Sequence, residues 1–221
     1  MGAVDNTSLP LKIKQLGLQD YQHVWQAMQD FTQSRDQQTQ DELWAVEHPP
    51  VYTLGRNGKE EHILQKSNIP IINVDRGGQV TYHGPGQLVI YLLLDLHRRK
   101  LGIRQLVTLI EDCLIRLLAS YQIKARSDKK APGVYINKEK IAALGLRVSK
   151  GCTTHGLSLN IDMDLSPFQK INPCGYANLE VTQCKNLGIN DNMQKLSEKL
   201  LLLLDSSLED ANDVEAKHVG S

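Results

Sequence analysis

The thiol of Cys174 stands in a setting that suits a nucleophile. In the stretch "INPCGY" it lies between Pro173 and Gly175, which mark a turn, and side chains in turns tend to be exposed. Free cysteines are usually buried as small apolar residues. Cys174 therefore either fills a pocket beneath a loop or is presented by that loop as a reactive thiol.

A lysine is a suitable partner to activate such a thiol. A free thiol has a pKa of about 8.5 and is only slightly ionised at neutral pH, and an adjacent ammonium group lowers that pKa. Lys140 follows a predicted turn at the start of "KIAALGLRV", where the next residues are apolar and small. A lysine at the end of a strand is more often a solvated charge. The sequence alone does not show that Lys140 and Cys174 meet.

The segment "DRGGQVTYHGPGQ" (75–87) is predicted to bind a substrate. Its glycine pair lets the backbone approach a ligand closely and offers N–H groups as donors. It also carries an arginine, a threonine, a tyrosine and a histidine, which a simple hairpin turn does not need. The spacing is not that of a phosphate-binding P-loop. His155 is a second candidate, either as a group that orients a substrate or as a structural histidine.

The remaining cysteines and histidines give weaker signals. Cys113 and Cys152 are predicted to be packing residues, and Cys184 has no activating motif around it. The seven histidines show no metal-ligand spacing such as HExxH, so no metal and no cofactor is expected.

Composition narrows the class of protein. Lys plus Arg (25) equals Asp plus Glu (25) in the 221 residues, so no overall charge favours nucleic acid or an anionic membrane. The N-terminal segment lacks the pattern of a signal peptide, and no apolar run approaches the roughly 18 residues of a membrane span. Four cysteines without a CxxC pair indicate reduced thiols. We therefore expect a cytoplasmic protein.

Three helices and several strands are predicted to position these groups. Apolar residues recur with helical spacing over 21–31, 103–121 and 193–208. The nearly continuous apolar run 87–96 predicts a strand buried on both faces, and 155–161 alternates as a half-buried strand.

The segment "GVYINKEKIAALGLRV" predicts a hairpin that turns at 137–139. Strands interrupted by helices indicate an α/β (α+β) fold, a single domain with a mixed sheet flanked by helices. We assign this domain to residues 11–207, with a flexible lead at 1–10 and a flexible tail at 208–221.

Four motifs stand out along the chain, namely "RGGQVTYHGPGQ", "GVYI" leading to "KIAALGLRV", "THGLSLNIDMDLSPF" and "INPCGY". They occur in the order found in the lipoyl(octanoyl) transferase family, the octanoyltransferases of lipoate biosynthesis, which the chain closely resembles. The resemblance implies a biotin/lipoate protein ligase-like fold. It also implies transfer of octanoyl from octanoyl-acyl carrier protein, through a cysteine thioester, to a lysine amine of lipoyl domains. These acceptors belong to 2-oxoacid dehydrogenase complexes and the glycine cleavage H protein, and this is the first step of endogenous protein lipoylation.

The resemblance also assigns roles to residues. It implies that Cys174 carries the acyl thioester and that Lys140 lowers the thiol pKa and acts as a general base. The implied acyl-binding residues are Arg76, Gly77, Gly78, Gln79, Val80, Thr81, Tyr82, His83, Ala143, Leu144, Gly145, Gly156, Leu157 and Ser158. Of these, Leu144 and Leu157 are candidates to line an apolar tunnel for the acyl chain. No ATP is required, because one thioester is exchanged for another before the amide forms.

Three alternatives stay open from the sequence. The first is an ATP-dependent lipoate or biotin protein ligase of the same fold, the second a thiol hydrolase, and the third a catalytically silent binding module. We expect a monomer. The basic segments "HRRK" (97–100) and "SDKK" (127–130) are candidate docking patches for an acidic carrier protein, although solvated faces are the commoner explanation.

Overall fold

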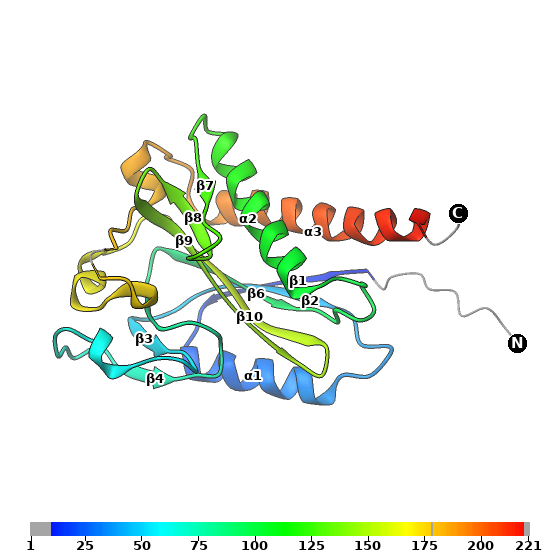
Figure 1. The fold of residues 1–221 in the computed structure, drawn as a ribbon, viewed down its shortest axis with the longest axis horizontal. Coiled ribbons are helices and arrows are strands. Elements are labelled where there is room, and N and C mark those ends of the chain that lie inside the picture. The colour runs from blue at the N-terminus through cyan, green and yellow to red at the C-terminus, as the bar shows by residue number, and fades with distance from the viewer. Residues whose placement is uncertain (1–9, 178, 219–221) are drawn as a thin grey trace, which may run out of the picture.

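A mixed seven-stranded sheet forms the centre of the computed structural model, which describes residues 10–177 and 179–218 (Figure 1). Its strands in spatial order are β1 (Lys12–Leu18), β2 (Glu42–Glu47), β6 (Gln87–Leu93), β10 (Cys152–Asn160), β9 (Glu139–Ser149), β8 (Gly133–Ile136) and β7 (Arg126–Ser127). Only β1 and β2 pair in parallel, and the other neighbours are antiparallel. The predicted mixed sheet and the predicted hairpin between β8 and β9 are confirmed.

A second, three-stranded sheet packs beside the first. It consists of β4 (Ile71–Asn73), β3 (Val51–Leu54) and β5 (Val80–His83). Four of the thirteen residues of the glycine-rich segment 75–87, predicted as a loop, therefore form a strand, β5. Short 3-10 turns complete this region, namely η1 (Glu60–His62), η2 (Ser166–Lys170), η3 (Pro173–Gly175) and η4 (Cys184–Leu187).

Three helices cover the large sheet. They are α1 (Tyr21–Ser34), α2 (Ile103–Ala119) and α3 (Met193–His218), as the apolar spacing predicts. Helix α1 lies on one face, and α2 and α3 lie on the other (Figure 1). The helix α1 begins at Tyr21 because the carboxylate of Asp20 accepts hydrogen bonds from the N–H groups of Gln22 and His23 at 2.9 and 3.1 Å.

Strand β6 shows how the sheet is buried on both faces. Leu88, Ile90 and Leu92 pack in the main core with α2 and α3, and Val89 and Tyr91 pack toward α1. The predicted double burial of this strand is confirmed. The neighbouring β10 was expected to be half-buried, and this is wrong, because residues 153–160 are all buried. Leu157 and Leu159 of β10 pack in the core with α2 and α3, and α1 also contacts this strand.

Helix α3 extends beyond the predicted end of the domain at 207. It continues to His218, and Leu208 is fully buried. The expected tail at 208–221 is therefore helical as far as His218, and 219–221 lie outside the described residues. So do residues 1–9 of the expected lead. Among the residues that the structure describes, no helix combines the length and apolar character needed to cross a bilayer.

Candidate active site

Cys174 and Lys140 meet at the edge of the large sheet. The Nζ atom of Lys140 donates to the Sγ atom of Cys174 at 3.2 Å, and also to the carbonyl oxygen of Pro132 at 3.1 Å. Lys140 is the second residue of β9 and only 3% exposed. A lysine buried to this degree is not the solvated strand-end charge that its local sequence allows. The two residues singled out from the sequence are in contact.

The surroundings of Lys140 keep its amine charged. Burial alone opposes the charge, but the sulfur of Cys174 and the hydroxyl of Tyr135 offset it, so the pKa of Lys140 lies above its ordinary value. The ammonium also lies 5.1 Å from the centre of the Tyr135 ring. A side chain at Gly133 would come within 3.2 Å of Nζ, so glycine at this position leaves room for the lysine. Lys140 therefore holds a positive charge 3.2 Å from the sulfur of Cys174.

The loop around Cys174 holds the thiol in an uncommon backbone conformation. Cys174 has φ 57° and ψ 15°, in the left-handed region that few non-glycine residues adopt. Gly175 follows with φ 80°, and a Cβ there would lie 2.8 Å from Cγ of Gln79. The hydroxyl of Tyr176 donates to the carbonyl of Lys130 at 2.9 Å. The turn predicted from "INPCGY" therefore presents the thiol, partly exposed, between the glycine-rich segment and the start of β8.

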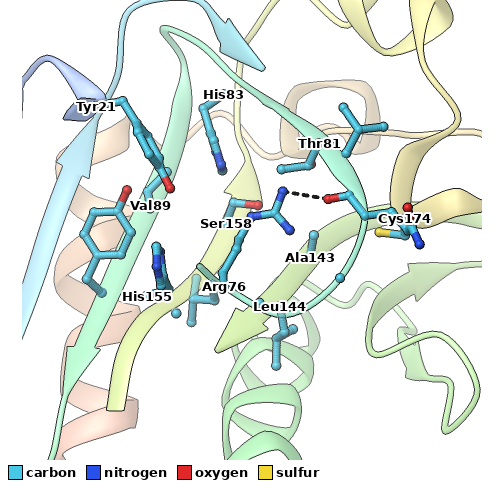
Figure 2. A pocket seen from close by; sticks show the side chains of 17 residues that line it. Tyr21, Arg76, Thr81, His83, Val89, Ala143, Leu144, His155, Ser158 and Cys174 are labelled. Atoms are coloured by element: carbon cyan, nitrogen blue, oxygen red, sulfur yellow. Dashed lines mark hydrogen bonds between the residues drawn. The ribbon is translucent and has the colours of Figure 1, made fainter. Parts of the chain in front are cut away.

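A cavity, here called the main cavity, runs from Cys174 between the glycine-rich segment and the β9–β10 pair (Figure 2). Its walls include most of the acyl-binding residues implied by the resemblance: Arg76, Gly78, Gln79, Val80, Thr81, His83, Ala143, Leu144, Gly145, Gly156, Leu157 and Ser158. Sequence reasoning missed Tyr21, Val89 and Tyr91, which complete the wall. The only signal for Tyr91 was a hydroxyl in an otherwise apolar strand.

The register of β9 and β10 decides which residues face the main cavity. Ala143 pairs with Ser158 and Gly145 with Gly156, so their small side chains share the face toward the cavity. Leu144, paired with Leu157, lies on the opposite face, where both pack into the core with α2 and α3. Both leucines belong to the wall of the main cavity, but their side chains pack into the core because side chains alternate along a strand, so their part in an acyl tunnel stays a prediction.

Two further predicted residues stand outside the wall of the main cavity. Tyr82 packs in the core of the smaller sheet, with its ring 5.6 Å from that of Tyr52 and 5.5 Å from that of Phe168. The N–H of Gly77 donates to the carbonyl of Leu146 at 3.1 Å. Gly77 thus ties the glycine-rich segment to β9.

Arg76 shapes the glycine-rich segment from within. Its Nη1 donates to the carbonyl of Gly77 at 2.9 Å, and its Nη2 donates to the carbonyls of Gln79 at 2.8 Å and Thr53 at 2.7 Å. The guanidinium is buried, and these acceptors satisfy much of its hydrogen-bonding capacity. Its first role is therefore to fold the segment over the cavity.

His155 lies at the end of the main cavity away from Cys174 (Figure 2). Its Nε2 is 2.8 Å from Oδ1 of Asp75, which also accepts from Nε1 of Trp25 at 3.0 Å, while Oδ2 of Asp75 lies 2.9 Å from Nη1 of Arg147. The hydrogen bond from His155, with the contacts to Trp25 and Arg147, holds the pKa of Asp75 well below its usual range. The histidine that the sequence left between two roles thus reaches the cavity wall.

The other thiols are poor nucleophiles. Cys113 and Cys184 are buried, which confirms the packing role predicted for Cys113. Burial raises the pKa of Cys184 to about 12 and also raises the pKa values of Cys113 and Cys152. Among the described residues, no three or more His, Cys, Asp or Glu side chains form a group that could hold a metal ion.

The basic segment 97–100 lies far from Cys174. Asp95 pairs with Cys152 at the start of β10, whereas the cavity reaches Cys174 near Ser158, toward the other end of that strand. Two of its arginines are already bound to a buried carboxylate, since Arg98 and Arg99 both form ion pairs with Asp41.

The basic segment 127–130 lies beside the active site. The carbonyl of Lys130 accepts the hydrogen bond from Tyr176, two residues after Cys174. Lys129 and Lys130 are exposed. Of the two candidate patches, only this one borders the thiol.

Comparison with known proteins places the chain in a family. Residues 20–204 match the family described as the lipoyl protein ligase A/B catalytic domain. The chain belongs to this family. An octanoyltransferase of Shewanella frigidimarina is 60% identical over 191 residues, which cover 86% of this chain and 88% of that protein. One of Shewanella halifaxensis is 58% identical over 198 residues, 90% of each chain. The family resemblance found in the four sequence motifs is confirmed.

Solved structures agree with this fold. A lipoate-protein ligase A bound with ATP superposes with a TM-score of 0.76 at 12% identity, over 96% of this chain and 94% of that one. The biotin protein ligase of Aquifex aeolicus in complex with biotin and ATP gives a TM-score of 0.57 at 13% identity, over 92% of this chain and 72% of that one. At such low identity the likeness shows the fold alone, and it confirms the predicted fold class.

Proposed function

We propose that this protein is an octanoyltransferase that forms a thioester on Cys174 and then passes the acyl group to a lysine amine. The observation that carries the proposal is the 3.2 Å contact between Sγ of Cys174 and Nζ of Lys140 at the opening of the main cavity. The names of the two Shewanella relatives support the choice of octanoyl. The donor is octanoyl-acyl carrier protein, and no cofactor takes part.

The first step loads Cys174. Its thiolate attacks the carbonyl carbon of the donor thioester, and the donor's C–S bond breaks as the tetrahedral intermediate collapses. The departing pantetheine thiolate takes a proton from the ammonium of Lys140, which leaves that amine neutral. One thioester replaces another, so the net free-energy change is small.

The second step delivers the acyl group. The amine of the acceptor lysine attacks the thioester carbonyl, and the neutral amine of Lys140 takes its proton as a general base. Cys174 leaves as a thiolate beside the restored ammonium, so the catalytic pair returns to its starting state. Amide formation from a thioester is downhill, and ATP is therefore not needed.

Backbone N–H groups supply the oxyanion site in this proposal. The glycine-rich segment lies directly against the cysteine loop, since a Cβ at Gly175 would meet the side chain of Gln79. We assign the oxyanion to the N–H groups of Gly78 and Gln79, because Pro173 has no N–H and the N–H of Gly175 already donates to the carbonyl of Asn172. Donors of this kind typically contribute about 3 to 4 kcal/mol to the transition state.

The partners follow from this chemistry. An acidic carrier protein would dock on the exposed lysines of 127–130, which border the thiol, whereas the arginines of 97–100 are already paired. The acceptors are lipoyl domains of 2-oxoacid dehydrogenase complexes and the glycine cleavage H protein. The monomeric state and the cytoplasmic location stay predictions.

Intact-mass measurement tests the proposal. The purified protein is incubated with octanoyl-acyl carrier protein in the absence of ATP, and peptide mapping locates the adduct. We expect one octanoyl group on Cys174, which disappears when a lipoyl domain is added and reappears on that domain. An adduct on Cys152 contradicts the proposal. Transfer only with ATP favours the ligase alternative, free octanoate favours the thiol hydrolase, and carrier binding without an adduct favours a silent binding module.

A further inference from the structure

His155 carries an unpaired hydrogen-bonding atom at the inner end of the main cavity. Within the described part of the chain, its Nδ1 atom is buried and has no hydrogen-bond partner. The residue is 2% exposed and belongs to the cavity wall. Figure 2 shows His155 and Tyr21 at one end of the cavity and Cys174 at the other. A chain that extends inward from Cys174 therefore reaches His155 last.

The partner of the other ring nitrogen defines the chemistry of Nδ1. Asp75 is ionised and accepts from Nε2, so the proton of the ring resides on Nε2. Burial lowers the pKa of His155, which keeps the ring neutral. Trp25 and Arg147 fix the carboxylate of Asp75 in turn. Nδ1 is therefore a hydrogen-bond acceptor with its lone pair unused.

The backbone of β10 departs from strand geometry at this residue. His155 has φ 62° in the middle of a strand whose neighbours pair regularly with β9. A non-glycine residue in the left-handed region costs free energy and persists where the surrounding structure holds it. The next residue, Gly156, allows β6 to approach closely, since a Cβ there would lie 2.0 Å from the carbonyl oxygen of Ile90. The position of the imidazole is therefore imposed by its surroundings.

The groups around His155 make the inner end of the cavity polar. The ring of Tyr91 lies 6.3 Å from that of His155, and its hydroxyl is bonded to Nε2 of His48 at 2.7 Å. An alkyl chain cannot donate a hydrogen bond to Nδ1. An alkyl tip placed against this atom leaves the buried acceptor unsatisfied, whereas a donor placed there satisfies it, and an unsatisfied buried acceptor costs more than burial of one further methylene gains. An alkyl chain is therefore favoured up to this wall and disfavoured beyond it.

The position of the wall matches a chain of eight carbons. His155 precedes Ser158 by three residues on β10, and Ser158 borders Cys174. Three residues of a strand span about 10 Å. The seven C–C bonds of an extended octanoyl chain, each about 1.5 Å long and arranged in a zigzag, span about 9 Å.

We propose that His155 is the residue that sets acyl chain length, with the unpaired Nδ1 rejecting alkyl tips beyond the eighth carbon and accepting a hydroxyl placed there. This inference rests on the proposed octanoyl transfer. It assigns His155 to specificity, while Cys174 and Lys140 carry out the reaction.

Two substitutions distinguish the contribution of the imidazole ring from that of its acceptor atom, and both new residues tolerate a positive φ. His155→Gly removes both, and His155→Asn keeps a polar atom near the place of Nδ1. Each protein is offered mixed C8, C10 and C12 acyl-carrier thioesters, and intact mass gives the ratio of adducts on Cys174. We expect His155→Gly to raise the C10 to C8 ratio about tenfold or more, as expected for removal of a methylene-sized barrier. His155→Asn should stay within about threefold of the parent.

A measurement on the unchanged protein tests whether Nδ1 of His155 accepts a hydrogen bond from the bound chain. An 8-hydroxyoctanoyl thioester should acylate Cys174 at a rate within about threefold of octanoyl, because Nδ1 accepts its hydroxyl proton. An unchanged C10 to C8 ratio in His155→Gly overturns the inference, as does an 8-hydroxyoctanoyl rate tenfold or more below that of octanoyl. In both results the octanoyl adduct still forms. Absence of that adduct from the unchanged protein instead contradicts the proposed function.

Discussion

The two ends of the main cavity use the same device for different purposes. Each end has a non-glycine residue in the left-handed region, Cys174 with φ 57° and His155 with φ 62°. Each of these residues contacts a charged partner, Lys140 at 3.2 Å and Asp75 at 2.8 Å. Backbone strain of this kind collects at functional sites because the surrounding structure must hold it.

The ends differ in exposure and in the sign of the partner's charge. Cys174 is partly exposed beside a cation, so its sulfur can be reached from outside the protein. His155 is buried beside an anion, which fixes a neutral ring in one tautomer. In the proposed mechanism the outer end of the cavity reacts, whereas the inner end keeps its protonation state and its contacts. Four experiments test this difference.

Removal of the nucleophile should have the largest effect. Cys174→Ala leaves no thiol at the cavity opening, so both the acyl adduct and transfer to a lipoyl domain should be lost entirely. Intact mass and a gel-shift assay of the acceptor measure the two steps. Cys152→Ala is the matched control and should behave like the parent, and transfer that persists without Cys174 would remove the distinction between the two ends.

Removal of the cation should have the next largest effect. In the proposed mechanism Lys140→Ala deletes the general base and the ammonium assigned to stabilise the thiolate, and loss of such a group usually slows a reaction by about 10² to 10⁴. Alkylation of Cys174 by iodoacetamide should also require higher pH to reach half of its maximal rate. Lys138→Ala changes an exposed lysine in the preceding turn and serves as control. An alkylation profile identical to the parent's would rule out the assigned role of Lys140.

The two glycines between the ends should differ in their tolerance of a side chain. A Cβ at Gly156 would lie 2.0 Å from the backbone oxygen of Ile90, whereas one at Gly145 would lie 3.1 Å from Cδ of Arg76, part of a side chain. We expect Gly156→Ala to lower the free energy of unfolding by about 3 kcal/mol and Gly145→Ala by about 1 kcal/mol. Urea denaturation measures both. Equal losses would show that the inner part of the cavity is less rigid than its packing indicates.

The buried histidines near the inner end should make stability depend on pH. Burial lowers the pKa of His48 to about 4 and that of His83 to about 3. The unfolded chain takes up these protons below about pH 6.5, while the folded protein does not, so stability falls as pH falls from 6.5 toward 4. Each histidine contributes a loss of about 2 kcal/mol between pH 7 and pH 5.

Urea denaturation of a histidine variant at the two pH values checks this dependence. His83→Gln should show a smaller difference between pH 7 and pH 5 than the parent. His23→Gln, at an exposed position of α1, should show the parent's difference. If the stability difference between pH 7 and pH 5 were the same in His83→Gln as in the parent, the folded protein would protonate His83 as readily as the unfolded chain does.

Much of the framework was predictable because it depends on neighbours in the sequence. The helices α1 and α2 appear as apolar stripes, and β6 appears as a continuous apolar run. The half-buried status expected for β10 was wrong because Gly156 and Ser158 look like an exposed face. Their burial depends on a segment about 80 positions earlier in the chain, which no local pattern reports.

The sequence by itself determined the three helices, the strand β6, the β8–β9 hairpin, the turn that presents Cys174 and, through four motifs, the family. Only the tertiary structure decided which residues act together. Lys140 and Cys174 are 34 positions apart, and Asp75 and His155 are 80 apart. Helical and strand periodicity arises within a few residues, whereas these contacts depend on strand register and on the packing of one sheet against another. For the same reason only the structure showed that Leu144 and Leu157 face the core, and that the inner wall of the cavity ends in an unpaired nitrogen.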